Sequence, residues 1–245
     1  MDRFNNKVVI ITGAGKGIGR SIALDFSKEG ANVVLVSRTL SDLEKVSSEI
    51  KSNGKDSLIV TADVSRESDV IRIFKKTLEK YKTVDILINN AAVQKRNHIT
   101  KISLDEWNYQ IGVNLTGAFL CMREALKIMI EKNYGKIVNI ASEAGKQGSS
   151  VKSAYCSSKG GMIRLTESAA ADVKENNINI NAVCPAWVDT PLSHQSYPHI
   201  DFTKVDVMKP EEVSKVVLFI ASEDAKEIKG STIDVFGGQK LVIDP

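Results

Sequence analysis

The chain is poor in cysteine and histidine, and both shortages exclude whole classes of site. Its 245 residues contain three cysteines and three histidines. The cysteines are odd in number, far apart and without a CxxC pair, which indicates reduced thiols in an intracellular protein rather than a disulfide scaffold. Zinc needs closer ligand spacing, so no metal is expected. The residues concerned are Cys121, Cys156, Cys184, His98, His194 and His199.

Charge of one sign and long apolar runs are also scarce. The 33 Lys and Arg residues against 30 Asp and Glu leave a formal net charge of +3, too little to make nucleic acid or an anionic membrane the expected partner. The first apolar run, at 8–11, is too short for a secretory signal, and no stretch approaches the roughly 18 apolar residues of a membrane helix. The sequence therefore predicts a soluble, cytoplasmic protein.

Short β-branched runs alternate with longer helical patterns along the whole chain. No repeat, low-complexity stretch or Pro/Gly-rich linker divides it, so a single domain at 1–245 is expected. Most of the expected strands are apolar on both faces, as in a parallel sheet covered by helices. We predict an α/β fold: one doubly wound (Rossmann) domain with a six- to seven-stranded parallel sheet and helices on both faces. Strands are expected at 7–11, 32–36, 57–61, 84–88, 136–140, 179–183 and 231–235, and helices at 17–29, 41–52, 67–80, 105–131, 153–175 and 210–222.

Three local signals refine this reading. Ser41 and Ser103 are expected to cap helices, and Pro210 followed by two glutamates is a good helix start. The segment 191–208 breaks the alternation and lies beyond a strand end. We therefore expect it to be a mobile substrate lid.

Glycine is concentrated directly after the first expected strand. The sequence TGAGKGIG at 12–19 passes from that strand into the first expected helix. Glycines permit a tight turn and a close approach of the backbone to a pyrophosphate, and the helix N-terminus adds free N–H groups. In this strand–turn–helix context the motif predicts a dinucleotide site. Its residues would be Gly13, Gly15, Lys16, Gly17, Ile18 and Gly19.

The end of the second expected strand indicates which dinucleotide is bound. An NAD site normally carries an acid there for the ribose 2′-hydroxyl, but this chain has Ser37 and Arg38. Arg38 can pair with a 2′-phosphate, and Lys16 lies in the glycine turn nearby. NADP(H) is therefore favoured over NAD(H), with two ordinary surface cations as the alternative.

A second constellation points to proton transfer. Tyr155 and Lys159 are spaced i, i+4, so on a helix they share one face. Ser142 follows the expected strand 136–140, at the edge where the cofactor should lie. A free phenol has a pKa near 10, and a nearby ammonium together with a cationic nicotinamide would lower that pKa.

Taken together, these motifs resemble the short-chain dehydrogenase/reductase family. The matching segments are TGAGKGIG at 12–19, Asp63-Val64, NNAA at 89–92, Asn114, Ser142, YCSSK at 155–159 and PAWVDT at 185–190. The resemblance implies hydride transfer between NADP(H) and a carbonyl or secondary alcohol. The chain is most similar to 3-oxoacyl-[acyl-carrier-protein] reductases, with sugar or polyol dehydrogenases as the alternative, and a homodimer or homotetramer is implied. A catalytically silent dinucleotide-binding regulator is the alternative of another class.

The resemblance also assigns roles. Tyr155 would be the acid in reduction and the base in oxidation, Lys159 would bind the nicotinamide ribose and lower the tyrosine pKa, and Ser142 would orient the substrate oxygen. Asn114 would hold a water that links Lys159 to a proton relay. The further cofactor contacts would be Asp63 and Val64 at the adenine, Asn89 and Ala91 on the adenosine side, and Pro185, Val188 and Thr190 near the nicotinamide.

Three departures from the family pattern concern the backbone near the cofactor. Ala92 and Ala186 stand where the family has glycine, and Phe236 interrupts its C-terminal VDGG, which here ends at Gly238. Either alanine would demand a negative φ.

Other residues invite a substrate or partner role. Those expected to flank a pocket for a polar or anionic substrate are Gln94, Lys95, Arg96, Glu143, Gln147 and Trp187. Candidates for a carrier-protein patch are Lys127, Lys132 and Lys174, although Ala171 stands where such reductases often have arginine.

Overall fold

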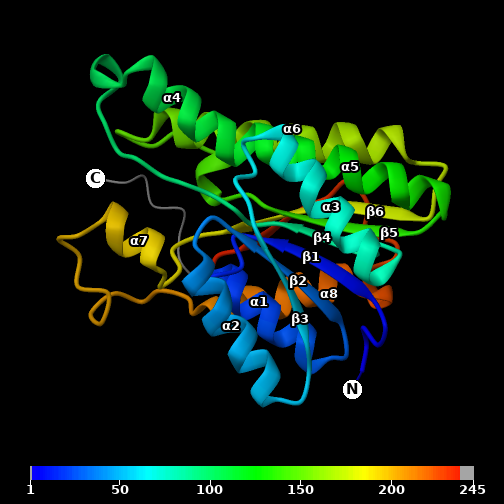
Figure 1. The fold of residues 1–245 in the computed structure, drawn as a ribbon. Coiled ribbons are helices and arrows are strands. Elements are labelled where there is room, and N and C mark those ends of the chain that lie inside the picture. The colour runs from blue at the N-terminus through cyan, green and yellow to red at the C-terminus, as the bar shows by residue number, and fades with distance from the viewer. Residues whose placement is uncertain (1, 238–245) are drawn as a thin grey trace.

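The computed structural model describes residues 2–237, so Gly238 lies outside the described residues. A sheet of seven parallel strands forms the centre of the molecule (Figure 1), which confirms the predicted fold class. The strands are β1 (Val8–Thr12), β2 (Asn32–Ser37), β3 (Ser57–Thr61), β4 (Ile86–Asn89), β5 (Gly135–Ile140), β6 (Ile178–Pro185) and β7 (Thr232–Val235). The helices are α1 (Gly17–Lys28), α2 (Leu40–Ser52), α3 (Glu67–Tyr81), α4 (Leu104–Ile111), α5 (Gly117–Glu131), α6 (Ser153–Asp172), α7 (Pro191–Ser196) and α8 (Pro210–Ala221).

The strand order is β3-β2-β1-β4-β5-β6-β7. The chain therefore proceeds outward from β1 in one direction, returns to it, and proceeds in the other direction from β4. In open α/β sheets, ligands bind in the crevice at the carboxyl ends of the strands where this reversal occurs. The β1–β4 boundary is thus the expected place of the site.

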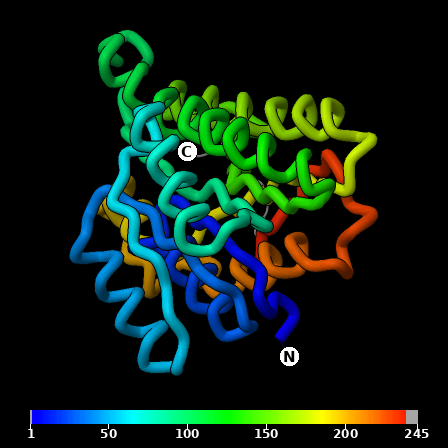
Figure 2. The backbone as a smooth tube through the Cα atoms, turned by 45° about the vertical axis from the view of Figure 1, so that its right-hand side comes forward, coloured from blue at the N-terminus to red at the C-terminus, as the bar shows by residue number. Residues whose placement is uncertain are grey.

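Helices cover both faces of the sheet, in two layers that Figure 2 shows above and below the strands. Helices α1, α2 and α8 pack on one face, and α3, α5 and α6 pack on the other. β1 is buried throughout because its side chains enter the apolar core on each side. No helix within residues 2–237 combines the length and apolarity that crossing a membrane requires.

The expected helix at 105–131 is wrong in one respect, because a π-helical turn, η2 (Gly112–Thr116), separates α4 from α5. A π turn widens the helix by one residue and is frequently found at functional sites. Asn114 lies inside this turn and is fully buried. Its side chain bonds to a neighbouring segment, an interaction that apolar periodicity cannot reveal.

Two of the three helix-start predictions are confirmed. Ser103 accepts a hydrogen bond from the Glu106 N–H at the start of α4, and α8 begins at Pro210. The prediction for Ser41 is wrong, because α2 begins at Leu40 and Thr39 occupies the cap position. Several other element ends differ by one to three residues from expectation, the usual uncertainty at frayed ends.

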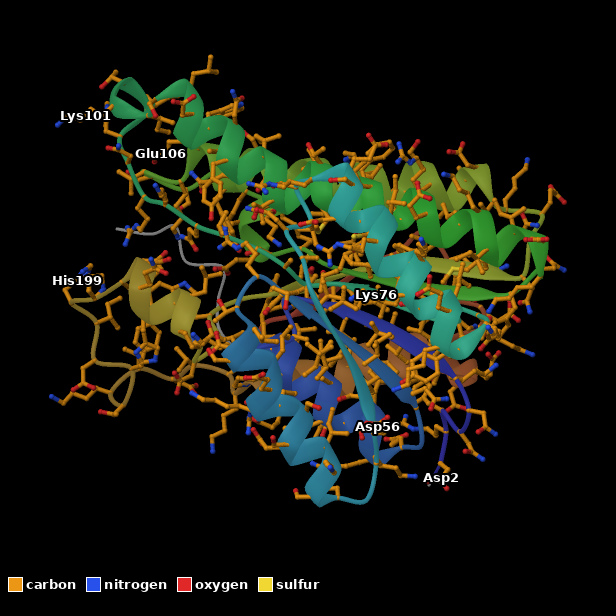
Figure 3. The ribbon with its side chains drawn as sticks, viewed as in Figure 1. Asp2, Asp56, Lys76, Lys101, Glu106 and His199 are labelled. Carbon is orange, nitrogen blue, oxygen red and sulfur yellow. The ribbon has the colours of Figure 1, made fainter. Side chains whose placement is uncertain are left out.

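The segment 191–208 contains a short helix, α7 (Pro191–Ser196), rather than irregular chain alone. Val188, just before the segment, and Met208, its last residue, form a parallel β-bridge that brings the two ends of this loop together. Figure 3 shows the loop beyond α7 extending away from the sheet, with His199 at its outer edge. We call residues 191–208 the lid segment. Whether it moves stays a prediction.

Candidate active site

Three adjoining hollows form one groove at the carboxyl ends of the strands. The inner cleft lies beside Ser142, Tyr155 and Lys159. The middle cleft adjoins it and runs between the glycine turn, Arg38 and α7, and the outer cleft ends at Asp63. Ala92 lines all three hollows. The groove therefore connects the expected proton-transfer groups with the expected adenosine site.

The glycine turn forms part of the wall of the middle and outer clefts. Gly13 and Gly17 have φ angles of +66° and +51°, a region that L-residues with side chains rarely adopt. A Cβ on Gly13 would also lie 2.8 Å from the Asn90 amide nitrogen. No side chain therefore covers the backbone of the turn beside the start of α1, and a pyrophosphate could approach the backbone N–H groups there.

The boundary between β1 and β4 is held by side chains that bond to backbone. Thr12 accepts hydrogen bonds from the Asn90 and Ala91 N–H groups, and the Asn90 amide donates to the Thr12 and Gly13 carbonyls. Asn89 was expected to line the adenosine side, but it is buried and donates to Asn139 at 2.8 Å. Asn90, one residue beyond the strand, lines the inner and middle clefts instead.

Arg38 projects between the middle and outer clefts. Its guanidinium donates to the Tyr109 hydroxyl at 2.8 Å, which holds it over the groove. Lys16 lines the same clefts and pairs with Asp42 at 2.9 Å. The structure therefore brings both cations to one stretch of groove, and it adds an acid, Asp42, that sequence reasoning did not consider.

Asp63 and Val64 line the outer cleft, together with Ser37 and Ala91. The Asp63 carboxylate accepts hydrogen bonds from the Ser65 N–H and hydroxyl, at 3.0 and 2.7 Å. These bonds fix the orientation of Asp63 at the end of β3. Gly19 lies behind the turn, where a Cβ would be 2.2 Å from the Gly13 oxygen, so it serves packing rather than contact with a ligand.

Ser142, Tyr155 and Lys159 meet in the inner cleft. Ser142 follows β5, and its hydroxyl accepts a hydrogen bond from the Ala144 N–H. Tyr155 and Lys159 lie one turn apart on α6, with the Lys159 ammonium 5.8 Å from the centre of the phenol ring. The ammonium donates to the Ile140 carbonyl at 2.6 Å. The trio predicted from sequence therefore shares one enclosed space.

Burial has the largest effect on the pKa values of Tyr155 and Lys159. It raises the pKa of Tyr155, against a hydrogen bond with Ser142 that lowers the pKa. It lowers the pKa of Lys159 to about 8. The expected lowering of the phenol pKa is thus not a property of the protein alone, because desolvation disfavours the phenolate more than its neighbours stabilise it.

Asn114 bonds to two neighbouring segments, and its expected role of holding a water stays a prediction. Its amide oxygen accepts from the Val93 N–H, and its amide nitrogen donates to the Val93 carbonyl and the Ser158 hydroxyl. Ser158 in turn donates to the Tyr155 carbonyl at 2.7 Å. Asn114 therefore ties the groove wall after β4 to the helix that carries Tyr155 and Lys159, without a direct bond to Lys159.

The three residues expected near the nicotinamide line the inner cleft, together with Ile18 of the glycine turn; their contact with a cofactor stays a prediction. Pro185, Val188, Thr190 and Ile18 line the inner cleft. Thr190 also caps α7, where it accepts a hydrogen bond from the Ser193 N–H. Ala92 and Ala186 are not among the described residues with positive φ, so neither alanine strains the backbone.

Lys152 and Tyr197 are among the residues of the inner cleft that sequence reasoning missed. Lys152 lies three residues before Tyr155, a spacing that could have placed both on one helix face. Tyr197 belongs to the lid segment, which has no periodicity to read. Of the residues expected to flank the pocket, Gln94, Glu143 and Trp187 line the inner cleft and Gln94 and Lys95 line the middle cleft; Arg96 and Gln147 line neither.

The remaining candidates are surface or packing groups. The three cysteines are free, although Cys156 is only half-buried. His98 and His199 are exposed, whereas His194 lies 2.6 Å from the Asp189 carboxylate and stacks on Phe202. Among residues 2–237, no three or more His, Cys, Asp or Glu residues gather as metal ligands.

The chain is similar in sequence and structure to known proteins. The family model described as short chain dehydrogenase matches residues 7–201. A 3-oxoacyl-[acyl-carrier-protein] reductase of Synechocystis sp. is 32% identical over 98% of this chain and 100% of its own length. A meso-2,3-butanediol dehydrogenase of Serratia marcescens is 36% identical over 96% of this chain and 95% of its own. A variant of actinorhodin polyketide ketoreductase, solved with NADPH, superimposes with a TM-score of 0.89 at 30% identity, covering 95% of this chain and 96% of that one.

Proposed function

The chain belongs to the short-chain dehydrogenase family and is an oxidoreductase of carbonyl and alcohol groups, and we propose that it transfers hydride between NADP(H) and a 3-oxoacyl or 3-hydroxyacyl compound. The observation that carries this proposal is the meeting of Ser142, Tyr155 and Lys159 in the inner cleft. That cleft continues into the groove beside the glycine turn, so a bound dinucleotide would end beside the phenol.

Reduction needs a hydride at the carbonyl carbon and a proton at the carbonyl oxygen. NADPH supplies the hydride when it is bound. The Ser142 hydroxyl would hold the oxygen, and the Tyr155 hydroxyl would give it the proton; in oxidation the phenolate would take the proton back. Lys159 would stabilise that phenolate by its charge, 5.8 Å from the ring centre.

NADP(H) is proposed over NAD(H) on the basis of Arg38. The end of β2 carries Ser37 and Arg38 rather than an acid, and the guanidinium faces both the middle and outer clefts. A 2′-phosphate placed there would form charge-assisted hydrogen bonds with it. The related polyketide ketoreductase was solved with NADPH, which supports the same choice.

The substrate class is suggested by relatives that act on 3-oxoacyl groups. A diol or related polyol is the second candidate, because the butanediol dehydrogenase is 36% identical. Docking of an acyl-carrier protein gains no support from the lysines considered for it. Lys127 pairs with Glu124 and Lys132 pairs with Asp85, so their charges are largely compensated.

The proposal also includes the expected lid, domain organisation, location and oligomeric state. Residues 191–208 would form the substrate lid of a single 1–245 domain. A cytoplasmic location and a homodimeric or homotetrameric state are also proposed. A silent regulator is disfavoured because Asn114, Ser142, Tyr155 and Lys159 are all present.

The proposal is tested with purified protein and NADPH, following the loss of NADPH absorbance. The carbonyl substrates are 3-oxobutanoate, its methyl ester and its N-acetylcysteamine thioester; 2,3-butanediol with NADP⁺ tests the second candidate. We expect NADPH consumption that depends on a 3-oxobutanoyl compound. Turnover of the diol with no turnover of any 3-oxobutanoyl compound would favour the second candidate, and no turnover at all would overturn the proposal.

A further inference from the structure

Lys152 places a positive charge in the wall of the inner cleft. The residue is only 7% exposed, yet it lines the same hollow as Tyr155. Lys152 is the cap residue immediately before α6, and its carbonyl accepts a hydrogen bond from the Cys156 N–H at 2.8 Å. Lys152 and Tyr155 therefore line the same hollow from the start of α6.

A second cation, Arg96, contacts the same aromatic ring as Lys152 although it does not line the cleft. The Lys152 ammonium is 5.0 Å and the Arg96 guanidinium 4.1 Å from the centre of the Tyr197 ring. Arg96 also donates to the Ser196 carbonyl of the lid segment. Tyr197 thus brings together a cation from the wall after β4 and a cation from the start of α6. Among the described residues that line the inner cleft, Lys152 and Lys159 are the cations and Glu143 is the single acid, so cationic side chains outnumber acidic ones there.

The inner cleft is small and partly aromatic. Its cavity volume is about 120 Å³, below the roughly 300–1,000 Å³ of sites for drug-sized ligands. Trp187 packs on Tyr197 with ring centres 4.8 Å apart. Low-dielectric walls of this kind strengthen the attraction between a fixed cation and an anion. The space beside Tyr155 therefore suits a compact anionic molecule better than a long neutral chain.

We propose that the substrate is a short oxo acid, or the corresponding hydroxy acid, whose carboxylate is bound by Lys152 with Arg96 reinforcing the positive potential. The inference rests on the proposed function and refines it: the 3-oxoacyl unit enters as a free acid rather than as a thioester. The carboxylate does not react. The ketone carbon gains a hydride from NADPH and its oxygen gains a proton from Tyr155, which gives the hydroxy acid and NADP⁺.

The test compares three 3-oxobutanoyl compounds that differ only at C1, namely the free acid, the methyl ester and the N-acetylcysteamine thioester. For the wild type we expect kcat/KM for the acid to exceed that for each neutral compound by about tenfold or more. Lys152→Met should bring the acid-to-ester ratio close to one, mainly through KM for the acid. Lys152→Arg, which keeps the charge, should keep most of the preference. Lys51→Met, the same charge change at an exposed position of α2, should leave the ratio unchanged.

The possible results test the carboxylate site separately from the proposed oxidoreductase function. If the wild type turns over the ester or thioester as well as the acid, the carboxylate site is refuted while the oxidoreductase proposal stands. The same holds if Lys152→Met keeps the wild-type ratio. If none of the three compounds consumes NADPH, the proposed function fails and the inference fails with it. The wild-type comparison decides the question even if a Lys152 variant does not fold.

Discussion

Arg38 is the side chain that we propose sets the choice of cofactor. It lines the middle and outer clefts and is held by the Tyr109 hydroxyl, so little rearrangement is needed to meet a 2′-phosphate. Replacing it with an acid would repel that phosphate and offer the ribose hydroxyl of NAD(H) an acceptor.

Arg38→Asp should therefore reverse or flatten the preference between cofactors. We expect the ratio of kcat/KM for NADPH to that for NADH to fall about 10- to 100-fold, the effect of one charge-assisted contact. Steady-state kinetics with both cofactors measure it. Arg164→Asp, an exposed site on α6, is the control; an equal change there, or none at Arg38, would remove Arg38 from this role.

Because Lys159 is buried, we expect the free energy of unfolding of the cofactor-free protein to depend on pH. Burial lowers the pKa of this lysine to about 8 from 10.5, so between these pH values the unfolded chain binds more protons than the folded one. Stability from this group is present above pH 10.5 and is lost as the pH falls through 8. Urea denaturation at pH 7 and pH 9.5 should show wild type gaining stability relative to Lys159→Met as the pH rises. A constant difference between the two proteins would contradict the buried, destabilised ammonium.

The sequence could predict those site residues whose placement depends on local spacing, but not those whose placement depends on contacts between distant segments. Tyr155, Lys159 and Ser142 follow from helix spacing and a strand end, and the structure brings them together. Asn89 was confused with Asn90 because a one-residue shift at a strand end exchanges core and groove. Lys152 and Tyr197 meet across the cleft from segments far apart in sequence, so no local pattern connects them.

At the scale of elements, the turn η2 (Gly112–Thr116) is a junction between the helices and the groove. Asn114 bonds the Val93 backbone and the Ser158 hydroxyl from within it. Apolar periodicity predicted one continuous helix here because the pattern of α4 continues into α5. The widened turn depends on polar contacts to other segments, which periodicity does not contain.

Asn114→Ala should destabilise the protein by about 2–4 kcal/mol, because the Val93 N–H and carbonyl lose the Asn114 partner and the Ser158 hydroxyl keeps only its bond to the Tyr155 carbonyl. Urea denaturation gives the change from the shift in midpoint. Asn108→Ala, at an exposed position of α4, should cost less than about 0.5 kcal/mol. Equal stability of the two variants would show that the Asn114 contacts do not hold the groove wall.

For the molecule as a whole, the alternation of strands and helices was enough to predict a parallel, doubly wound sheet. Strands that are apolar on both faces require helices on both sides, and the seven-stranded order bears this out. The glycine turn at β1 and the reversal between β1 and β4 then place the groove. The sequence indicated 191–208 as a break in the alternation but could not give its position, because that depends on the Val188–Met208 bridge and on Tyr197 packing against Trp187.

The central claim is that this groove binds NADPH at one end and transfers a proton from Tyr155 at the other. The most direct measurement is turnover and NADPH affinity of Tyr155→Phe, which removes only the phenol oxygen, beside Tyr81→Phe on α3 as the control. We predict that Tyr155→Phe loses about 10²- to 10⁴-fold in kcat, with its calorimetric Kd for NADPH within about threefold of wild type and the control unchanged in both. Wild-type turnover by Tyr155→Phe would contradict the account.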